Sequence, residues 1–261
     1  MGKIIAVANQ KGGVGKSTTA INLSACLAEK GKKILAIDMD PQGNMTSGFG
    51  VDKNSVEQTL YELLLGENTI EECIMENVLE QLEGLDLIPT NMNLSGAEIE
   101  LVSIENKEYI LADALMEVAD RYDYVIMDCP PSLNMLTINA LAAADSMLVP
   151  IQCEYYALEG LSQLIHTVEL VRERMNENLE IEGIVFTMYD VRTNLSMEVV
   201  ENVKENLDQR IFETIIPRNV RLAEAPSYGL PVILYDTRST GANSYRSLAD
   251  ELIGREEKSW Q

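Results

Sequence analysis

The sequence is poor in the residue types on which many catalytic and metal sites depend. Its 261 residues include one histidine and four cysteines, and the cysteines show no Cys-x-x-Cys spacing. A zinc site or a disulfide framework is therefore not expected, and the thiols are predicted to be buried and inert. The histidine lies in a helical pattern without a nucleophile motif, so we predict a structural or solvated role for it. These residues are His166, Cys26, Cys73, Cys129 and Cys153.

Basic residues are also scarce. Lysine and arginine number 20 against 42 aspartates and glutamates, a net charge of −22, which opposes strong nonspecific attraction to nucleic acid or anionic membranes. Residues 210–246 nevertheless hold five arginines and three acidic residues, so a local basic patch remains open. Residues 52–108 hold 14 acidic and two basic residues. We expect that region to form a solvated outer layer, with a partner-binding face as the alternative.

Long apolar runs are absent as well. No run of about 18 apolar residues occurs, and the first residues lack the pattern of a secretion signal, so we expect a cytoplasmic protein without a membrane span. The hydrophobic share of 46% and the charged share of 24% are typical of a globular protein. No linker, repeat or low-complexity segment interrupts the chain. We therefore predict a single domain over residues 1–261, with about 255–261 as a short tail.

Short apolar runs rich in β-branched residues alternate with longer helical patterns. The apolar runs are continuous, which favours strands of a parallel sheet that is buried on both faces. The pattern predicts an α/β fold with a doubly wound, mostly parallel sheet, helices on both faces, and ligands at the carboxyl ends of the strands. Strands are predicted at 3–8, 33–38, 85–88, 123–128, 146–151, 182–187 and 212–216. Helices are predicted at 17–30, 57–65, 107–121, 134–144, 157–176 and 196–207.

The strongest functional signal lies in residues 10–18, which read Gln-Lys-Gly-Gly-Val-Gly-Lys-Ser-Thr between a predicted strand and a predicted helix. Strand, glycine-rich turn and helix are the context of a phosphate-binding loop. Glycines let backbone N–H groups approach phosphate oxygens, and the helix N-terminus adds partial positive charge. Lys16 can reach the β- and γ-phosphates, and the Ser17 hydroxyl is placed to bind Mg²⁺.

The loop departs from the ordinary pattern G-x-x-x-x-G-K-[ST] in one place. Gln10 stands where the pattern has glycine, and a second lysine, Lys11, precedes the glycines. A lone lysine there would be read as a solvated loop residue. The whole string, however, resembles the deviant Walker A motif of the ParA/MinD family of ATPases, in which the extra lysine reaches across a dimer interface to the partner's nucleotide. The resemblance implies nucleotide binding by Lys11, Gly12, Gly13, Val14, Gly15, Lys16, Ser17 and Thr18.

Two aspartates follow the second predicted strand, in residues 38–44 with the sequence DMDPQGN. The proline and glycine indicate a turn, which both aspartates could simply cap. A strand end beside a phosphate loop is also where a metal-linked or water-orienting acid belongs. The segment resembles switch I of the same family. That resemblance implies that Asp38 supports Mg²⁺ and the loop, and that Asp40 positions the attacking water.

The strand predicted at 123–128 ends in Asp128 and is followed by Pro130 and Pro131. A mostly apolar strand that ends in an aspartate is the Walker B pattern, whose carboxylate reaches Mg²⁺ directly or through a water. Alone, such an aspartate is a weak signal. With the phosphate loop upstream and a turn that resembles the family's switch II, it indicates that Asp128 binds the metal.

Two later segments resemble the chromosomal, Soj-type ParA branch of the family. Residues 150–162 resemble a segment near its dimer face, and we give Glu154 and Tyr155 there no catalytic role. Residues 216–226 resemble a loop in which Pro217 and Asn219 border the adenine. The resemblance also implies a DNA-contacting surface. Its candidate arginines are Arg192, Arg218 and Arg221, with Arg238 and Arg246 as further candidates for a local basic patch. Solvated helix and loop ends are the alternative.

The resemblance extends from Gly2 to about Leu252. It implies a Mg²⁺-dependent ATPase, slow without a partner, with Lys11, Lys16 and Asp40 as catalytic residues. The ATP-bound homodimer would bind double-stranded DNA nonspecifically. A ParB-like activator would stimulate hydrolysis, serving chromosome or plasmid segregation at the nucleoid. The DNA step fits the net charge of −22 least well.

Three other functions are alternatives. A MinD-like, membrane-associated ATPase needs a basic amphipathic tail, whereas residues 251–261 hold three glutamates and two basic residues. An electron-transfer ATPase like the nitrogenase iron protein needs paired cysteines for a cluster, and Cys129 has no second cysteine in a matching context. A metabolic P-loop enzyme that phosphorylates or ligates a small molecule stays open.

Overall fold

The computed structural model describes residues 2–154 and 157–259. Six strands form one sheet in the order β3-β2-β4-β1-β5-β6, and all neighbouring strands are parallel. This architecture confirms the predicted α/β fold, and the six strands match the predicted ranges to within two residues at either end. The strands are β1 (Lys3–Val7), β2 (Ile34–Asp38), β3 (Leu85–Ile88), β4 (Tyr124–Asp128), β5 (Ser146–Gln152) and β6 (Glu180–Thr187).

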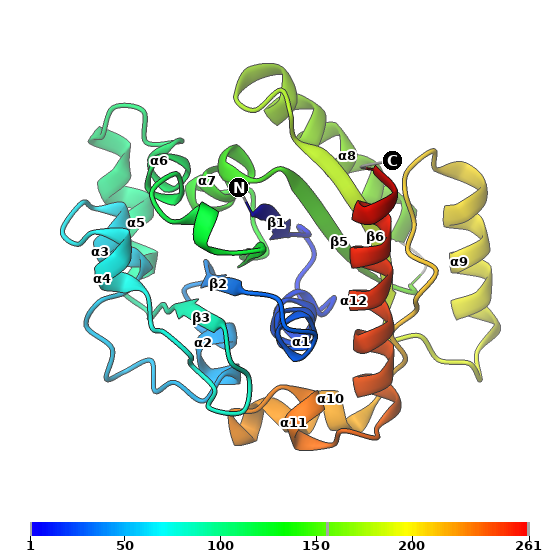
Figure 1. Cartoon of the computed structure of the whole chain (residues 1–261). Helices are drawn as coiled ribbons and strands as arrows, with labels where there is room; N and C mark the ends of the chain where they lie inside the picture. The colour runs from blue at the N-terminus through cyan, green and yellow to red at the C-terminus, as the bar shows by residue number, and fades with distance from the viewer. Residues whose placement is uncertain (1, 155–156, 260–261) are drawn as a thin grey trace.

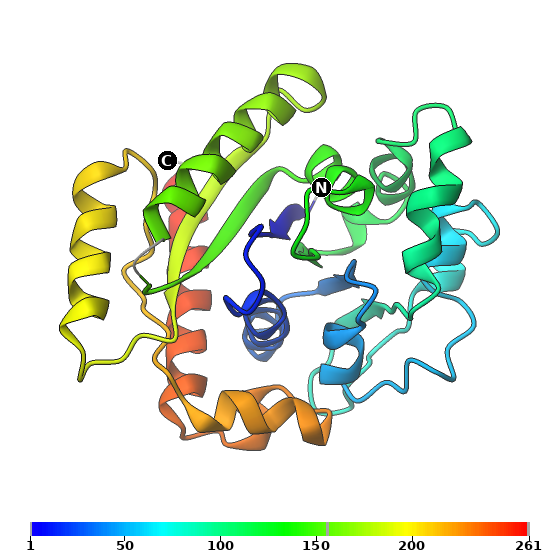
Figure 2. The same ribbon diagram turned by 180° about the vertical axis from the view of Figure 1, so that it is seen from behind.

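Helices cover both faces of the sheet (Figure 1 and Figure 2). Alternate strand residues enter two hydrophobic clusters, so that on β1 Ile4 and Ala6 face one layer while Ile5 and Val7 face the other. One layer contains α3 (Leu60–Leu64), α4 (Ile70–Cys73), α5 (Leu94–Glu100), η1 (Leu101–Ser103), α6 (Ile110–Leu115), η2 (Ala119–Arg121), α7 (Met135–Ala143), α8 (Ala157–Arg174) and α9 (Asn194–Asn206). The other contains α1 (Lys16–Glu29), α2 (Asn44–Gly48), α10 (Val220–Glu224), η3 (Ala225–Tyr228), α11 (Val232–Tyr235) and α12 (Thr240–Ser259).

The register of the strands brings three of the predicted segments together. Val7 at the end of β1 pairs with Asp128 at the end of β4, and Asp38 at the end of β2 pairs with the same Asp128. The loops that follow these strands therefore leave the sheet at one edge. In open parallel sheets this carboxyl edge is where ligands bind.

The prediction of a strand at 212–216 was wrong. This segment runs beside β6 but makes only isolated bridges at its ends, between Ile184 and Ile211 and between Tyr189 and Pro217. The reason lies in a side chain of α12. The Glu251 carboxylate accepts the N–H groups of Glu213 and Thr214 at 2.8 and 3.0 Å, so these groups are not available to a strand.

The helix predictions also needed correction. The helix predicted at 107–121 is shorter, because α6 ends at Leu115 and a separate turn, η2, follows. Helix α12 was not predicted, and it extends to Ser259, into the predicted tail. Its buried side chains Ala242, Tyr245, Leu248 and Leu252 join the cluster that contains α1, and α12 lies alongside α1 in Figure 1.

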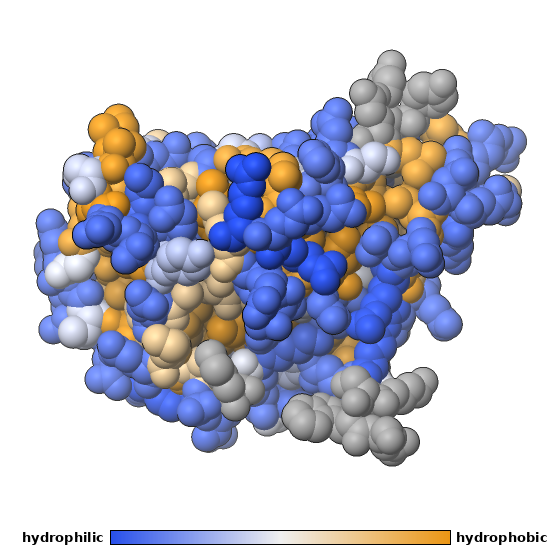
Figure 3. Space-filling model, turned by 90° about the horizontal axis from the view of Figure 1, so that it is seen from above, coloured by the Kyte–Doolittle hydropathy of each residue, from blue (hydrophilic) through white to orange (hydrophobic). Residues whose placement is uncertain are grey.

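Within the described residues, no helix combines the length and the apolar character that crossing a bilayer requires. Seen from above, hydrophobic side chains reach the surface in patches between hydrophilic ones (Figure 3).

Candidate nucleotide site

The loop between β1 and α1 is shaped by glycines. Gly13 and Gly15 have φ angles of +75° and +89°, a region that side-chain-bearing residues rarely adopt. Gly15 caps α1, and among the described residues no acceptor takes the N–H groups of residues 15–18. The N-terminal turn of a 14-residue helix thus presents free donors and partial positive charge at the carboxyl edge of the sheet. This arrangement is suited to binding an anion.

The loop is fastened to the sheet by residues that were not predicted. Thr187, at the end of β6, places its Oγ1 2.7 Å from the Val14 carbonyl oxygen and 3.0 Å from that of Ile151. At the start of the loop, the Asn9 side chain donates to the Pro150 carbonyl at 2.8 Å and accepts the Lys11 N–H at 3.0 Å. These bonds hold the loop against β5 and β6. No local motif marks them, because each partner lies far away in the sequence.

Lys16 lies over its own loop. Its side chain is buried, and Nζ donates to the Lys11 carbonyl oxygen at 3.1 Å. Burial lowers the pKa of Lys16, while the negative charges of Asp128 and Asp40 act in the opposite direction. A cation is therefore held among the N–H donors, close to two carboxylates.

Lys11 is placed differently. Its Nζ forms an ion pair with Glu154, and the two side chains are 50% and 43% exposed. The lysine thus sits at the rim, paired with a residue that follows β5. No catalytic role was predicted for Glu154, and Tyr155 lies outside the described residues.

Asp128 is the unsatisfied acid of the site. It is fully buried, and neither carboxylate oxygen has a hydrogen-bond partner among the described residues. Burial, and then the negative charge of Asp38, raise the pKa of Asp128 well above its usual value; Ser17 and Lys16 lie near enough to oppose this in part. A buried carboxylate without a protein donor fits a position that faces a bound cation or its water. The residues present therefore fit a Mg²⁺ ion next to Ser17.

Asp38 is buried to the same extent but is fully engaged. Its carboxylate accepts the N–H and the hydroxyl of Thr46, both at 2.7 Å, and the N–H of Asp40 at 3.3 Å. Burial raises the pKa of Asp38 to about 6, and the bonds from Thr46 counteract this rise. The carboxylate thereby ties the strand end to α2, a short helix that the sequence had indicated only as a turn.

Asp40 lies beside these groups. It is largely buried, and its Oδ1 accepts the N–H of Gln42 at 2.9 Å, while no described donor reaches Oδ2. Its charge influences both Lys16 and Asp38. The structure therefore brings the three predicted aspartates and Lys16 into one cluster.

A small pocket of about 200 Å³ adjoins the phosphate loop at Gly15 and Thr18. Pro217 and Asn219 line it, as the resemblance implied for the adenine. The lining residues that were missed include Met188 and Tyr245, the latter in the unpredicted helix α12. The Tyr245 hydroxyl lies 3.1 Å from Thr19 Oγ1, so this pocket is built against α1.

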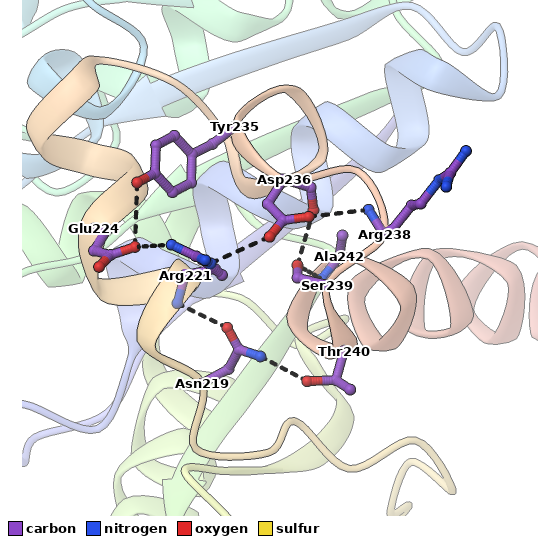
Figure 4. A network of polar contacts seen from close by, with 9 residues as sticks. All are labelled: Asn219, Arg221, Glu224, Tyr235, Asp236, Arg238, Ser239, Thr240 and Ala242. Carbon is purple, nitrogen blue, oxygen red and sulfur yellow. Dashed lines mark hydrogen bonds and ion pairs between the residues drawn. The ribbon is translucent and has the colours of Figure 1, made fainter.

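The three candidate DNA-binding arginines do not form one free patch. Arg192 is held by Asp190 through bonds of 2.8 and 2.7 Å. Arg221 contacts Glu224 at 2.8 Å and Asp236 at 3.2 Å (Figure 4). Arg218 is exposed, and no ion pair of its guanidinium occurs among the described residues.

The predicted burial of the cysteines and the solvated position of the histidine are confirmed. All four cysteines are buried and unpaired, and burial raises the pKa of each thiol. The His166 side chain is 71% exposed, 3.8 Å from Glu169, which is a solvated position.

Comparison with known proteins places this geometry in a family. A family model described as an AAA domain matches residues 2–181. The sporulation initiation inhibitor protein Soj of Bacillus subtilis is 55% identical over 252 residues, 97% of this chain and 98% of that protein. The chromosome partitioning protein ParA of Myxococcus xanthus is 52% identical over 256 residues, 98% of this chain and 89% of that protein.

A solved structure agrees over the whole length. The crystal structure of cobyrinic acid a,c-diamide synthase from Mycobacterium smegmatis, with a bound ATP analog and magnesium, has a TM-score of 0.86 and 35% sequence identity, and the match covers 100% of this chain and 98% of that chain. A phosphate loop, a strand-end aspartate and full-length relatives thus agree, and the chain belongs to the ParA/MinD family of P-loop ATPases.

Proposed function

We propose that this chain is a dimerising ATPase switch of the Soj/ParA partition type. ATP is its substrate and Mg²⁺ its metal. ATP-bound protomers form a dimer, and this dimer binds double-stranded DNA nonspecifically. A ParB-like partner stimulates hydrolysis. The switch acts in chromosome or plasmid segregation, in the cytoplasm at the nucleoid. The observation that carries the proposal is the different placement of the two loop lysines. Lys16 is buried over its own loop, whereas Lys11 is half-exposed at the rim.

The chain's own groups account for binding of the triphosphate. The free N–H groups of residues 15–18 and the Lys16 ammonium hold the phosphate oxygens. The base occupies the pocket beside Thr18, with Pro217 and Asn219 at its border. Phosphoryl transfer to water requires mainly positioning and charge neutralisation, and this site is rich in both.

Ser17 and Asp128 are the residues that would hold Mg²⁺, and the unsatisfied carboxylate of Asp128 supports this assignment. When bound, the ion neutralises charge on the β- and γ-phosphate oxygens. Asp38 supports the same region indirectly, because its oxygens already accept three bonds that order the segment before α2.

Asp40 orients the attacking water through Oδ2, the oxygen that no described donor reaches. Lys11 of the partner subunit neutralises the charge that develops as the γ-phosphate leaves. For this the lysine exchanges its pair with Glu154 for the neighbouring triphosphate. Such a half-exposed ion pair is weak, so the exchange costs little. Hydrolysis removes the shared nucleotide and releases the dimer.

Sedimentation velocity with ATP and Mg²⁺ tests the proposal. Asp40→Ala is expected to form a persistent dimer, because ATP binds but is not hydrolysed. Lys16→Ala is the matched control and is expected to stay monomeric and to lose nucleotide binding. If Asp40→Ala remains monomeric at saturating ATP, the switch proposal is refuted.

The DNA step is tested separately, by fluorescence anisotropy of a labelled duplex at low salt. Binding is expected with ATP and Mg²⁺ and not with ADP. A wild-type dimer without affinity for duplex DNA would leave the switch in place and assign it another cargo.

A metabolic function is the second candidate, because a structure named as an amide-forming synthase is 35% identical to this chain. The two candidates differ in what accelerates ATP turnover. DNA together with a ParB-like partner is expected to do so, whereas stimulation by a small carboxylic acid with amide formation would favour the second.

Co-sedimentation with anionic liposomes tests the MinD-like alternative. Arg255, a basic residue of α12, is tied to Glu251 and to the Ile211 carbonyl and is therefore not free to contact an anionic surface.

A further inference from the structure

An aspartate lies between two arginines of the candidate DNA surface. Asp190 follows β6 and binds the Arg192 guanidinium through both carboxylate oxygens, at 2.8 and 2.7 Å. The bonds from Arg192, and the nearby charge of Arg218, lower the pKa of Asp190 well below its usual value. Arg218 is also joined to this turn through its backbone, since its N–H donates to the Tyr189 carbonyl at 2.9 Å. The three charges thus form one cluster with a net charge of +1.

This cluster is not required to hold the fold together. The Arg192 side chain is 79% exposed, and a solvated ion pair of this kind contributes little to stability. The turn itself is held by other bonds. The Arg192 N–H donates to Asp190 Oδ1 at 3.0 Å, and the Thr193 hydroxyl donates to the Asp190 carbonyl at 3.1 Å. An asparagine at position 190 would keep the oxygen acceptor and favour the same turn without the charge.

Arg221 provides a contrast, as Figure 4 shows. It joins α10 to the end of α11 through Glu224 and Asp236, and the Tyr235 hydroxyl donates to Glu224 at 3.1 Å. Asp236 also accepts the N–H of Arg238 at 3.3 Å. This network connects α10 with α11 and the turn that follows it, so Arg221 serves the fold. Of the three candidates, Arg192 and Arg218 are the exposed arginines that lie outside this network.

We propose that Asp190 is a built-in competitor for DNA phosphate, which keeps the affinity of one protomer low. A phosphate that approaches Arg192 must displace a bidentate carboxylate and is repelled by it. Two joined protomers present the surface twice, and the linked contacts add up. Asp190 therefore makes DNA binding depend on the ATP-bound dimer. This inference rests on the proposed DNA binding and adds a residue that sets its strength.

The first test compares Asp190→Asn with Glu57→Gln. Both changes remove one negative charge, but the Glu57 side chain is exposed, lies in a different part of the chain and has no described polar partner. Anisotropy titrations with a labelled duplex are run from 50 to 200 mM salt, with ATP and Mg²⁺ and without nucleotide. Asp190→Asn is expected to bind about tenfold tighter at low salt and to steepen the slope of log K against log salt by about 0.9 per protomer. It is also expected to bind detectably without nucleotide.

The second test compares variants in which the net charge of the cluster of Asp190, Arg192 and Arg218 differs. This charge is +2 in Asp190→Asn and 0 in Arg192→Ala. It is +1 in the wild type and in the double variant Asp190→Asn with Arg192→Ala. The affinity for DNA is expected to increase with this charge, so that Asp190→Asn rescues Arg192→Ala. All variants should unfold at the temperature of the wild type, which a merely structural role of Asp190 would not allow.

The outcomes separate the two proposals. If the wild type binds DNA with ATP and Asp190→Asn behaves like Glu57→Gln, or if the double variant is as weak as Arg192→Ala, the role of Asp190 is wrong and the proposed function stands. If no variant binds duplex DNA at 50 mM salt with ATP and Mg²⁺, the role of Asp190 and the DNA-binding step of the proposed function are both overturned, while the ATP-dependent dimer stands or falls by the sedimentation test.

Discussion

At the scale of single residues, Asp128 has the largest conflict between folding and function. Neither oxygen of its buried carboxylate has a hydrogen-bond partner among the described residues, and the nearby Ser17 and Lys16 offset the cost of the buried charge only in part. Asp128→Asn is therefore expected to stabilise the nucleotide-free protein by about 1–2 kcal/mol at pH 8 while it abolishes hydrolysis. Denaturant unfolding and phosphate release measure the two effects.

The pH dependence of this gain follows from the sign of the shift. Burial raises the pKa of Asp128 in the folded state above its value in the unfolded state. The folded wild type therefore avoids the cost of a buried charge at a pH below the unfolded-state pKa, and it loses this stability as the pH rises through the folded-state pKa. The advantage of Asp128→Asn should therefore grow with pH and fade in acid. Asp113→Asn, at an exposed carboxyl of α6, is the control. A gain that is constant from pH 5 to 8 would contradict the assignment.

The residues near Asp128 also show what the sequence could and could not predict. Lys16, Ser17 and Asp128 stand at fixed offsets from a glycine-rich loop or a strand end, so local pattern and parallel register suffice to bring them together. Thr187 and Glu154 have no such mark. They contact the loop only because β5 and β6 happen to end beside it, which is a property of the strand order and not of any local stretch.

At the scale of elements, α12 was missed although its buried residues are spaced for a helix. Ala242, Tyr245, Leu248 and Leu252 line one face, but the first turns also hold a glycine, an asparagine and two serines, whose helix propensity is low. Packing against α1 overrides that weak propensity. The same helix explains why no strand forms at 212–216. The Glu251 carboxylate of α12 accepts the N–H groups of Glu213 and Thr214, and the sequence around these residues does not indicate such a long-range bond.

This role of Glu251 can be tested. Its carboxylate accepts two backbone N–H groups and pairs with Arg255, so Glu251→Ala is expected to destabilise the protein by about 2–3 kcal/mol in denaturant unfolding. The nucleotide affinity should weaken with it, since the held segment continues into Pro217 of the base pocket. Asp250 lies on the same helix and forms an ion pair with Lys30 at the end of α1. Because the Asp250 side chain is solvated, Asp250→Ala is expected to change stability by less than about 0.5 kcal/mol. Equal losses in the two variants would contradict this account.

At the scale of the whole molecule, Lys11 is the residue whose function a single chain does not complete. Lys11→Ala is expected to leave nucleotide binding within about threefold of the wild type, because Lys16 and the loop N–H groups remain. It is expected to abolish both ATP-dependent dimerisation and turnover. Equilibrium binding of a labelled nucleotide, sedimentation velocity and phosphate release separate these effects. Lys33→Ala, an exposed lysine at the opposite end of the strands, is the control. Unchanged self-association in Lys11→Ala would remove the basis for a shared nucleotide.

Net charge makes dimerisation and DNA binding respond to salt in opposite ways. Two protomers of charge −22 repel each other, and moderate salt screens this repulsion over a Debye length of about 8–10 Å. DNA binding, in contrast, releases counterions from the duplex and therefore weakens as salt is added. Each neutralised phosphate contributes about −0.9 to the slope of log K against log salt. Between 50 and 200 mM salt, the dimer fraction of Asp40→Ala with ATP is therefore expected to rise or stay constant while its DNA affinity falls at least tenfold. Sedimentation velocity and anisotropy on the same samples measure both. If the two fall in parallel, the local arginine cluster and the global charge are not acting separately, and DNA binding would have to be limited by dimer formation alone.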